Sequence, residues 1–513
     1  MYNSAKARFT SGPEIKDISP CGTHYCHSVI EERMSLSMRL FFNYTWCFIL
    51  GLFFVSLNVS YGSDPREWSP TWKLPPGQRP ENIVDLPITV PGDVRISQFF
   101  SPISCGACHP EIFKMWSGST HANAWRNPLF QALYNLGKKT AEGESEKRNI
   151  ESCVRCHFPI GHSGAEASLP LDDEKGGVIC DFCHSVRATT GVGNAPYILS
   201  PGNAAAMEGG TKYGPFADSP ETIHKNQYSE LHTRSEFCGG CHDVSHAGNN
   251  LPIEQTYTEW RQGPYNTGDP KTTIHCQDCH MRQRPGFPCT GSTDRPDNPG
   301  FASPEIMGGK KRPHIWTHYF VGGSVTSISL PSGSELQQQM AVERLKNAAT
   351  LEVSVNPASK RGDLLKFHID IKNTGAGHHI PTGLTEMRQV WLHVSVTDAE
   401  DKIIYQSGKV DEKGNIDSNA TIYHTVFGNE KGEETLHVWA ATHIISDNRI
   451  PPKGKKEEHF ICLLPNDAKS PLKIKAVLHY RSAPQDVVDA LLGEKSMKLP
   501  IIDMAEVLKE ISL

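Results

Sequence analysis

The chain has 513 residues, of which 38% are hydrophobic and 21% are charged, and its formal net charge is −6 at pH 7. It contains too many apolar residues for an intrinsically disordered protein and is not basic enough for a typical nucleic-acid-binding protein. At about 150 residues per domain, the length suggests about two to four domains. The 15 cysteines and 24 histidines exceed what an ordinary cytosolic enzyme of this size carries, so their positions are the main guide to function.

The first predicted segment is an N-terminal extension with an export signal, residues 1–62. Positions 40–59 hold no charged residue, Arg33 and Arg39 precede this apolar run, and small residues follow it. This order is typical of a Sec-type signal peptide. An uncleaved anchor is the alternative, because about 20 uncharged residues can span a bilayer. We therefore expect a periplasmic or otherwise extracytoplasmic protein that contacts a membrane only through an uncleaved signal segment.

Residues 63–99 contain prolines at short intervals from Pro65 to Pro91. Proline lacks a backbone donor and fits neither a long helix nor a central strand, so this stretch predicts an extended arm over the surface. Residues 100–325 are rich in glycine and proline, and only short helices are expected there, such as 111–116 and 128–136. Hydrophobic periodicity alone does not account for a core in this region.

Five copies of the sequence C-x-x-C-H occur within residues 100–325. In c-type cytochromes the two thiols form thioether bonds to haem, and the adjacent histidine becomes the proximal iron ligand. A single copy could be a redox dithiol or half a zinc site, but zinc ribbons do not place histidine after every second cysteine. The copies predict five haem c groups, which would fill this region. The predicted thioether residues are Cys105, Cys108, Cys153, Cys156, Cys180, Cys183, Cys238, Cys241, Cys276 and Cys279, and the predicted proximal ligands are His109, His157, His184, His242 and His280.

Each haem iron also has a sixth coordination position. The haem region contains more additional histidines than five irons need, which favours bis-histidine, low-potential electron carriers. His121 and His318 have the most favourable surroundings, because Ser and Gly neighbours allow the backbone to approach a haem closely. The distal candidates are His121, His318, His162, His224 and His232, followed by His246 and His378.

The remaining cysteines are not expected to bind haem. Cys21 and Cys26 form a C-x4-C-H sequence, but they lie upstream of the export signal, whereas haem is attached after export. Cys289 and Cys462 lie outside all the motifs. They could form a disulfide between domains or remain two buried thiols, and the sequence leaves both open.

The C-terminal part has a different pattern. A connecting helix is expected near 335–349, within a linker of residues 326–349. In residues 350–483, apolar residues alternate with polar ones between Gly, Asn and Pro turns, which predicts an antiparallel, immunoglobulin-like β-sandwich. The loop 373–383 contains His378 and His379, and it is either a structural loop or a haem cap that supplies a ligand. Residues 484–513 suggest a helical tail. The fold class expected is therefore α+β and multidomain, with a haem-packed, mainly short-helical cytochrome domain before the sandwich.

Several longer motifs surround the C-x-x-C-H copies. They are Ser101 to His109, Trp116-Ser-Gly-Ser-Thr-His121, Gly177-Val-Ile-Cys180-Asp-Phe-Cys183-His184, Glu236-Phe-Cys238-Gly-Gly-Cys241-His242, Thr256-Tyr-Thr-Glu-Trp260, Cys276-Gln-Asp-Cys279-His280-Met281 and His318-Tyr-Phe-Val-Gly-Gly323. As a set they resemble the multihaem cytochromes of the cytochrome c-554 and hydroxylamine-oxidoreductase-related family. The similarity covers about residues 98–325, and it implies a haem-packed fold, electron transfer, and a distal ligand role for His121. The chain departs from the tetrahaem members by its fifth motif and its long C-terminal part.

These observations favour an electron-transfer cytochrome over an enzyme, and no catalytic residue is predicted. The expected partners are redox proteins, with a homo-oligomer or a cytochrome complex as further options, and nucleic acid is not expected. One alternative is an oxidoreductase that acts on a small nitrogen or sulfur compound at a five-coordinate haem. No motif has Lys in place of the proximal histidine, as nitrite-reductase relatives do, which counts against that alternative. The other alternative is a structural subunit of a cytochrome complex.

Overall fold

The computed structural model describes residues 94–161, 175–325, 334–356 and 360–513. The predicted export signal, most of the proline-rich arm and the distal candidate His162 lie outside the described residues. The described residues belong to one compact unit. Among the described residues, no helix has both the length and the apolar character needed to cross a membrane.

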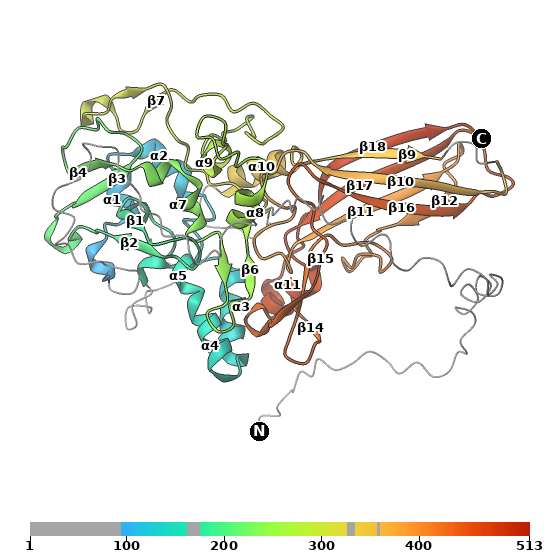
Figure 1. The fold of residues 1–513 in the computed structure, drawn as a ribbon, viewed down its shortest axis with the longest axis horizontal. Coiled ribbons are helices and arrows are strands. Elements are labelled where there is room, and N and C mark those ends of the chain that lie inside the picture. The colour runs from blue at the N-terminus through green and yellow to red at the C-terminus, as the bar shows by residue number, and fades with distance from the viewer. Residues whose placement is uncertain (1–93, 162–174, 326–333, 357–359) are drawn as a thin grey trace, which may run out of the picture. The chain divides into compact units, whose positions relative to one another are not determined.

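Short helices separated by loops form most of residues 100–325 (Figure 1). Proline and capping side chains fix where several of them begin. The hydroxyl of Ser101 accepts the N–H of Ile103 at the start of α1, and the side chain of Asn127 accepts two N–H groups at the start of α3. The helices are α1 (Pro102–Gly106), α2 (Pro110–Ser117), α3 (Pro128–Thr140), α4 (Gly143–Ser152), α5 (Val154–His157), α6 (Cys180–Cys183), α7 (Ser235–Gly239), α8 (Thr256–Gln262) and α9 (Cys276–His280).

Two-stranded sheets and single 3₁₀ turns lie between these helices. All of these strand pairs are antiparallel except β3 and β4, which run parallel. The pairs are β1 (Val186–Thr189) with β2 (Tyr197–Leu199), β3 (Thr211–Gly214) with β4 (Lys225–Tyr228), β5 (Val244–Ser245) with β6 (Pro252–Glu254), and β7 (Gly300–Phe301) with β8 (Lys311–Arg312). The 3₁₀ turns are η3 (Ile96–Gln98), η4 (Pro159–Gly161), η6 (Ala204–Ala206), η7 (Glu230–Thr233) and η8 (Glu305–Met307).

The described end of the proline-rich arm alternates between buried and exposed side chains. Val94 and Phe99 are 1% and 0% exposed, whereas Arg95 and Ser97 are exposed, so residues 94–99 lie at the surface with their apolar side chains turned inward. The side chains of Val94 and Phe99 belong to an apolar cluster that also includes Trp116 and Phe158. The apolar side chains of the arm are buried here because they pack against aromatic side chains of residues 100–325, which we call the haem-motif region.

The C-terminal part begins with α10 (Ser334–Leu345) and continues as two antiparallel sheets, which we call the two-sheet region, residues 349–513 (Figure 1). One sheet has the order β16-β10-β9 and the other has the order β12-β11-β17-β18. The strands are β9 (Ala349–Val355), β10 (Leu364–Asn373), β11 (Gln389–Thr397), β12 (Ile403–Ser407), β16 (Lys455–Leu463), β17 (Leu472–Arg481) and β18 (Ile502–Ile511).

The two sheets share one apolar core. Phe367, Ile369 and Ile371 alternate inward from β10, and they pack in one cluster with Val390 and Leu392 of β11. The period-two pattern in the sequence places every second side chain on the same face of a strand. The alternating segments predicted as antiparallel strands are therefore confirmed as strands.

The C-terminal tail is not wholly helical, so that prediction is wrong in part. A short helix, α11 (Gln485–Leu492), is followed by the 3₁₀ turn η10 (Gly493–Lys495) and then by β18. β18 pairs antiparallel with β17 along most of its length. Its residues have good helix propensity, but pairing with β17 and burial of Ile502 and Met504 override that propensity. The sheets therefore extend past residue 483, and the connecting helix α10 ends at Leu345 rather than at 349.

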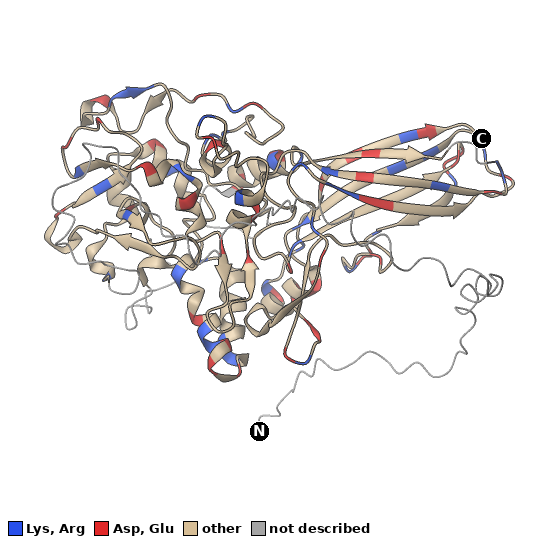
Figure 2. Ribbon diagram, viewed as in Figure 1, with Lys and Arg blue, Asp and Glu red and all other residues tan. Residues whose placement is uncertain are grey.

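A small third sheet with the order β14-β13-β15 completes this part. Figure 2 shows charged residues of both signs on α4 and along the strands of the two-sheet region. On β10, Lys366 is exposed while its neighbours Leu365 and Phe367 are buried, so the charges lie on the outer face. The remaining elements are β13 (Thr425–Gly428), β14 (Glu434–Thr435), β15 (His443–Asp447) and the 3₁₀ turn η9 (Val438–Ala440).

Replacing Met504 by Ala tests the placement of β18. Met504 is 2% exposed within the shared core, so M504A should destabilise the two-sheet region by about 2–5 kcal/mol. Leu508 on the same strand is 54% exposed, so L508A should change stability by about 0.5 kcal/mol or less. Denaturant unfolding followed by far-ultraviolet circular dichroism measures both. Equal effects of the two substitutions would show that β18 does not contribute Met504 to the core.

Candidate haem-binding site

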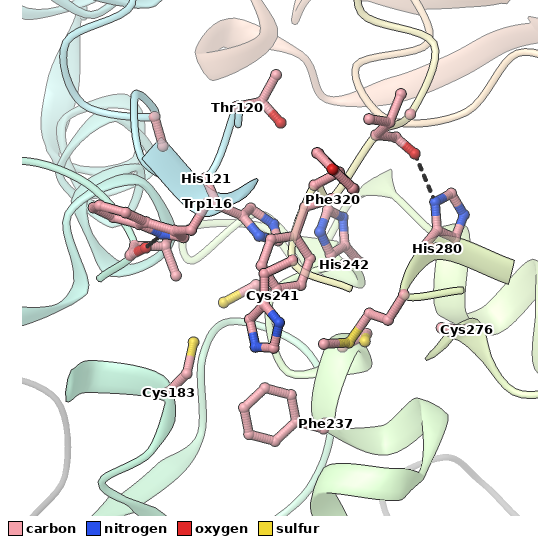
Figure 3. A pocket seen from close by; sticks show the side chains of 18 of the residues that line it. Trp116, Thr120, His121, Cys183, Phe237, Cys241, His242, Cys276, His280 and Phe320 are labelled. Atoms are coloured by element: carbon pink, nitrogen blue, oxygen red, sulfur yellow. Dashed lines mark hydrogen bonds between the residues drawn. The ribbon is translucent and has the colours of Figure 1, made fainter. Parts of the chain in front are cut away.

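The five C-x-x-C-H motifs line one continuous, mainly apolar cavity, and residues of the two-sheet region such as His378 and Tyr480 contribute to its wall. Each motif forms about one helical turn. The N–H of His109 donates to the carbonyl of Cys105, and that of His242 donates to the carbonyl of Cys238, both at 2.9 Å. This i to i−4 bond carries the histidine back beside the first cysteine. Figure 3 shows His121, His242 and His280 with Cys183 and Cys241 along the cavity.

Thiols of different motifs contact one another across the cavity. Cys105 of the first motif interacts with Cys180 of the third, and Cys156 of the second interacts with Cys241 of the fourth. Cys238 of the fourth motif interacts with Cys276 of the fifth. All ten motif cysteines are free thiols. Free thiols facing a shared apolar cavity fit covalent haem attachment, and the contacts make the first and third, second and fourth, and fourth and fifth motifs neighbours.

Each predicted proximal histidine has a polar group beside its Nδ1 atom, which leaves Nε2 for an iron ion. In four motifs this group is a backbone carbonyl. In the fourth motif it is a carboxylate, because Oε1 of the buried Glu254 lies 3.9 Å from Nδ1 of His242, an ion-pair distance that is too long for a hydrogen bond. The carbonyl contacts are His109 to Ala302 at 2.8 Å, His157 to Ala124 at 3.4 Å, His184 to Tyr213 at 2.7 Å and His280 to Val321 at 2.9 Å.

Four proximal histidines face a second imidazole at a characteristic separation. Two imidazoles on opposite sides of one iron ion, with metal–nitrogen distances of about 2.0 Å, place their ring centroids about 6.2 Å apart. The observed separations cluster around this value. They are 6.4 Å for His109 and His224, 6.1 Å for His242 and His121, 6.4 Å for His280 and His378, and 5.8 and 6.4 Å from His184 to His232 and His318.

Hydrogen bonding distinguishes the two neighbours of His184. Both ring nitrogens of His232 are engaged, Nδ1 with the hydroxyl of Ser229 at 2.9 Å and Nε2 with the carbonyl of Cys183 at 3.0 Å. Among the described residues, His318 contacts a carbonyl through Nδ1 alone, at 2.9 Å from the oxygen of Trp316. Because a ligand needs one nitrogen lone pair for the metal, the arrangement favours His318 as the partner of His184.

Burial keeps these imidazoles neutral, the form that binds a metal. Burial lowers the pKa of His121 to about 3 and that of His318 to about 3. His242 behaves differently: burial lowers its pKa, but Glu254 and the thiols of Cys241 and Cys276 together outweigh burial and raise it to about 9. The carboxylate therefore stabilises a proton on Nδ1 of His242 more strongly than a carbonyl would.

The remaining histidines near the motifs have different environments. His162 lies outside the described residues. His246 is 2% exposed, and its Nδ1 is near the side-chain oxygen of Asn249. His275 contacts Ser235 through Nδ1, so it supports the start of α9. His378 comes after the first distal candidates in the sequence, because no local pattern indicates that a loop between two strands reaches the fifth motif.

Cys289 and Cys462 are free and buried in the structure. Cys462 belongs to the shared core of the two-sheet region, where it contacts apolar residues. Of the two options that the sequence left open, the structure has two buried thiols.

Comparison with known proteins gives a local match and a structural match. Residues 104–185, which include the first three motifs, match the family described as cytochrome c554 and c-prime. The structure resembles a penta-heme cytochrome c552 from Thermochromatium tepidum with a TM-score of 0.54 and 18% identity, covering 81% of this chain and 99% of that chain. These two matches support a multihaem c-type cytochrome. Residues 104–185 are thus similar to a c-type cytochrome family, and the likeness to the penta-heme structure concerns the fold.

Two further structural matches concern other kinds of protein. A CARDB domain from Pyrococcus furiosus, in complex with di-metal ions, matches with a TM-score of 0.15 and 10% identity over 32% of this chain and 85% of that chain. A glycosyl hydrolase family 2 member from Bacteroides cellulosilyticus matches with a TM-score of 0.15 and 13% identity over 32% of this chain and 15% of that chain. These TM-scores are too low to relate either protein to this chain. No curated protein matches the chain.

Substitution of His318 and His232 tests which of them acts at the third motif. H318A should convert one low-spin iron to a high-spin or water-ligated form without lowering the haem content, because its Nε2 is free for the metal. H232A should leave the number of low-spin irons unchanged, because both its nitrogens are engaged. Electron paramagnetic resonance of the oxidised protein measures this. The reverse pattern would assign the ligand role to His232.

Proposed function

We propose that this cytochrome is exported, carries five haem c groups, and passes electrons between redox partner proteins. The observation that carries the proposal is the contact between motifs. Thiols of the first and third, the second and fourth, and the fourth and fifth motifs interact, and Cys183 of the third motif lies within electrostatic range of Cys241 of the fourth. The attachment points of all five motifs are therefore close together. Bound haem groups supply one-electron transfer, and the protein holds them at closely spaced positions. His121, His318 and His224 are the proposed sixth ligands in this part of the chain.

The chain should hold five covalently bound haem groups. Each of the five motifs lines the cavity, whereas Cys21 and Cys26 precede the export signal. Mass spectrometry of the exported protein should give the mass of the processed chain plus five haem groups. Replacing Cys276 and Cys279 by Ser should remove one of them. A wild-type increment of four or six haem groups would contradict the count.

The carrier function predicts reversible one-electron reduction without turnover of a small substrate. Protein-film voltammetry should show five reversible one-electron transitions, and the current should not change when nitrite, hydroxylamine or sulfite is added. A catalytic current with one of these compounds would favour an oxidoreductase function instead.

The haem of the fourth motif should have a lower reduction potential than it would with a neutral neighbour. The negative charge of Glu254 beside Nδ1 of His242 stabilises the oxidised, more positive iron. E254Q should therefore raise the midpoint potential of one haem, as measured by potentiometric titration. Glu230, which pairs with Arg234, provides a control, and E230Q should leave the five potentials unchanged. Equal shifts in both variants would indicate a general charge effect.

A second candidate function is oxidoreduction of a small nitrogen or sulfur compound at an open iron position. One observation favours it. Among the residues the structure describes, His157 of the second motif has a ring neighbour in Phe130, at 3.9 Å, and forms no histidine pair like those of the other four motifs. A high-spin ferric signal in the wild-type protein that shifts on addition of the compound would support this function, and five low-spin signals would oppose it.

The two-sheet region has a proposed architectural role beside these functions. We treat it as an immunoglobulin-like β-sandwich whose outer face, with charges of both signs, is available to a redox partner, a second copy of the chain or another subunit of a cytochrome complex. Light scattering at several protein concentrations distinguishes a monomer from a homo-oligomer.

A further inference from the structure

The loop between β10 and β11 places a histidine of the two-sheet region against the fifth motif. The ring centroid of His378 lies 6.4 Å from that of His280, with an angle of 17° between the rings. Nδ1 of His378 lies 2.9 Å from the carbonyl of His379, which leaves Nε2 available. The separation of the two ring centroids and the available Nε2 atom match those of the histidine pairs within the haem-motif region.

The loop itself is held in a defined shape. The side-chain amide of Asn373 donates to the carbonyls of His378 and Ile450, and its oxygen accepts the N–H of Ala376. Ile380 exchanges two backbone bonds of 2.9 Å with Ile450. From the haem-motif region, the N–H of Gly291 donates to the carbonyl of Gly375 at 2.8 Å. The loop is therefore fixed at both ends.

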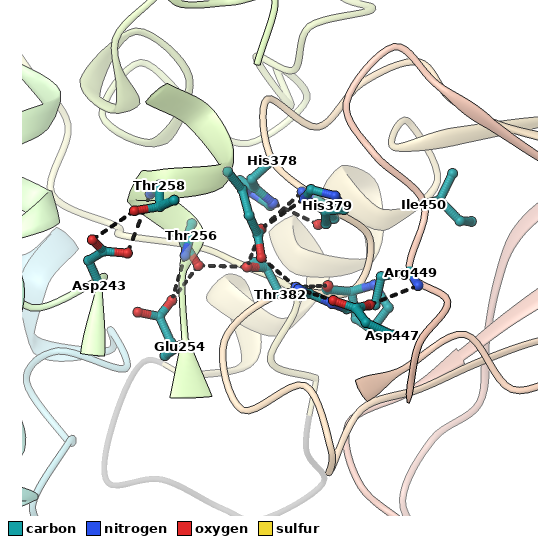
Figure 4. A network of polar contacts seen from close by, with 12 residues as sticks. Asp243, Glu254, Thr256, Thr258, His378, His379, Thr382, Asp447, Arg449 and Ile450 are labelled. Carbon is teal, nitrogen blue, oxygen red and sulfur yellow. Dashed lines mark hydrogen bonds and ion pairs between the residues drawn. The ribbon is translucent and has the colours of Figure 1, made fainter. Parts of the chain in front are cut away.

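One carboxylate from the haem-motif region binds the segment that follows His378. Glu259 lies on α8 and is 6% exposed (Figure 4 shows its surroundings). It accepts the backbone N–H of His379 at 3.0 Å and the hydroxyl of Thr382 at 2.9 Å. It also pairs with Arg449, which Asp447 holds from its other side. A buried carboxylate with these donors anchors the loop strongly, because each donor would otherwise lose a partner.

Helix α8 is in turn fixed to the fourth and fifth motifs. The N–H of Tyr257 donates to the carbonyl of His242, and the indole N–H of Trp260 donates to the carbonyl of Ile274 at 2.8 Å. Ile274 lies two residues before Cys276. Glu259 is therefore held at a fixed position relative to the fifth motif. Through its bonds to His379 and Thr382, it also fixes the position of His378.

We propose that His378 is the sixth ligand of the haem bound by Cys276 and Cys279, and that Glu259 is the positioning residue that holds it there. This rests on the proposed function, since it assumes that the fifth motif carries haem. A neutral imidazole donates its Nε2 lone pair to the iron, and neither oxidation nor proton transfer is required. The two-sheet region thus completes the iron coordination of one haem.

The experiment uses the full-length, haem-loaded protein and four variants: H378A, E259A, E259Q and the control D370N. Asp370 is a buried carboxylate of the two-sheet region that pairs with Lys455 and has no hydrogen bond to the loop, so D370N removes a comparable charge elsewhere. Haem content per chain is measured first, and then low-spin and high-spin ferric signals are counted by electron paramagnetic resonance.

H378A and E259A should each lose the same low-spin signal and gain one high-spin iron, with haem content unchanged. E259Q keeps the side-chain volume and one acceptor, so it should lose a smaller fraction of that signal. Free imidazole should restore the low-spin signal in H378A. D370N should keep all the signals of the wild-type protein.

The outcomes separate the two proposals. A wild-type protein without haem at the fifth motif would overturn the proposed function, and this inference with it. Full haem content together with an unchanged spectrum of H378A would overturn the ligand assignment alone. If H378A loses the signal while both E259A and E259Q retain it fully, Glu259 has no positioning role. If E259A does not fold, the spectrum of E259Q decides the positioning role in the same way.

Discussion

The geometry of the haem-motif region depends on one local interaction, the hydrogen bond from the histidine N–H of each motif to the carbonyl of its first cysteine. This single helical turn brings two thiols and an imidazole to one side of the backbone. A carbonyl or carboxylate then holds Nδ1, so that Nε2 is directed into the cavity. Short helices suffice for this purpose, and an extended helical core is not needed.

The haem-motif and two-sheet regions are stabilised in different ways. The two sheets bury their own alternating apolar residues in one core, independently of any cofactor. The haem-motif region instead surrounds a cavity, with aromatic clusters such as that of Trp125, Phe130 and Phe158 at its margin. Its packing is completed when the cavity is filled. Haem attachment and folding of this region should therefore be coupled, whereas folding of the two sheets should not depend on haem.

The two regions meet where α3 and α4 pack against α11 and η9, and again near the fourth and fifth motifs. Glu259, Arg449 and Thr382 form a buried polar network there, next to the loop that carries His378 (Figure 4). Arg344 of α10 adds a second link, since its guanidinium donates to the carbonyl of Cys279 at 2.9 Å. Buried charges of this kind are costly unless paired, so they define one relative placement of the two regions.

The sequence alone predicted the haem attachment points, because the C-x-x-C-H residues are brought together within a single helical turn and need no distant residue. It also determined the strands of the two-sheet region through period-two alternation. Only the tertiary structure decided which histidines face which motif, since pairs such as His109 with His224 and His280 with His378 join residues far apart in the chain. The same reason explains the tail, where pairing with β17 turned a segment of good helix formers into β18. Local patterns fix local geometry, whereas ligand pairs and edge strands depend on how distant segments pack.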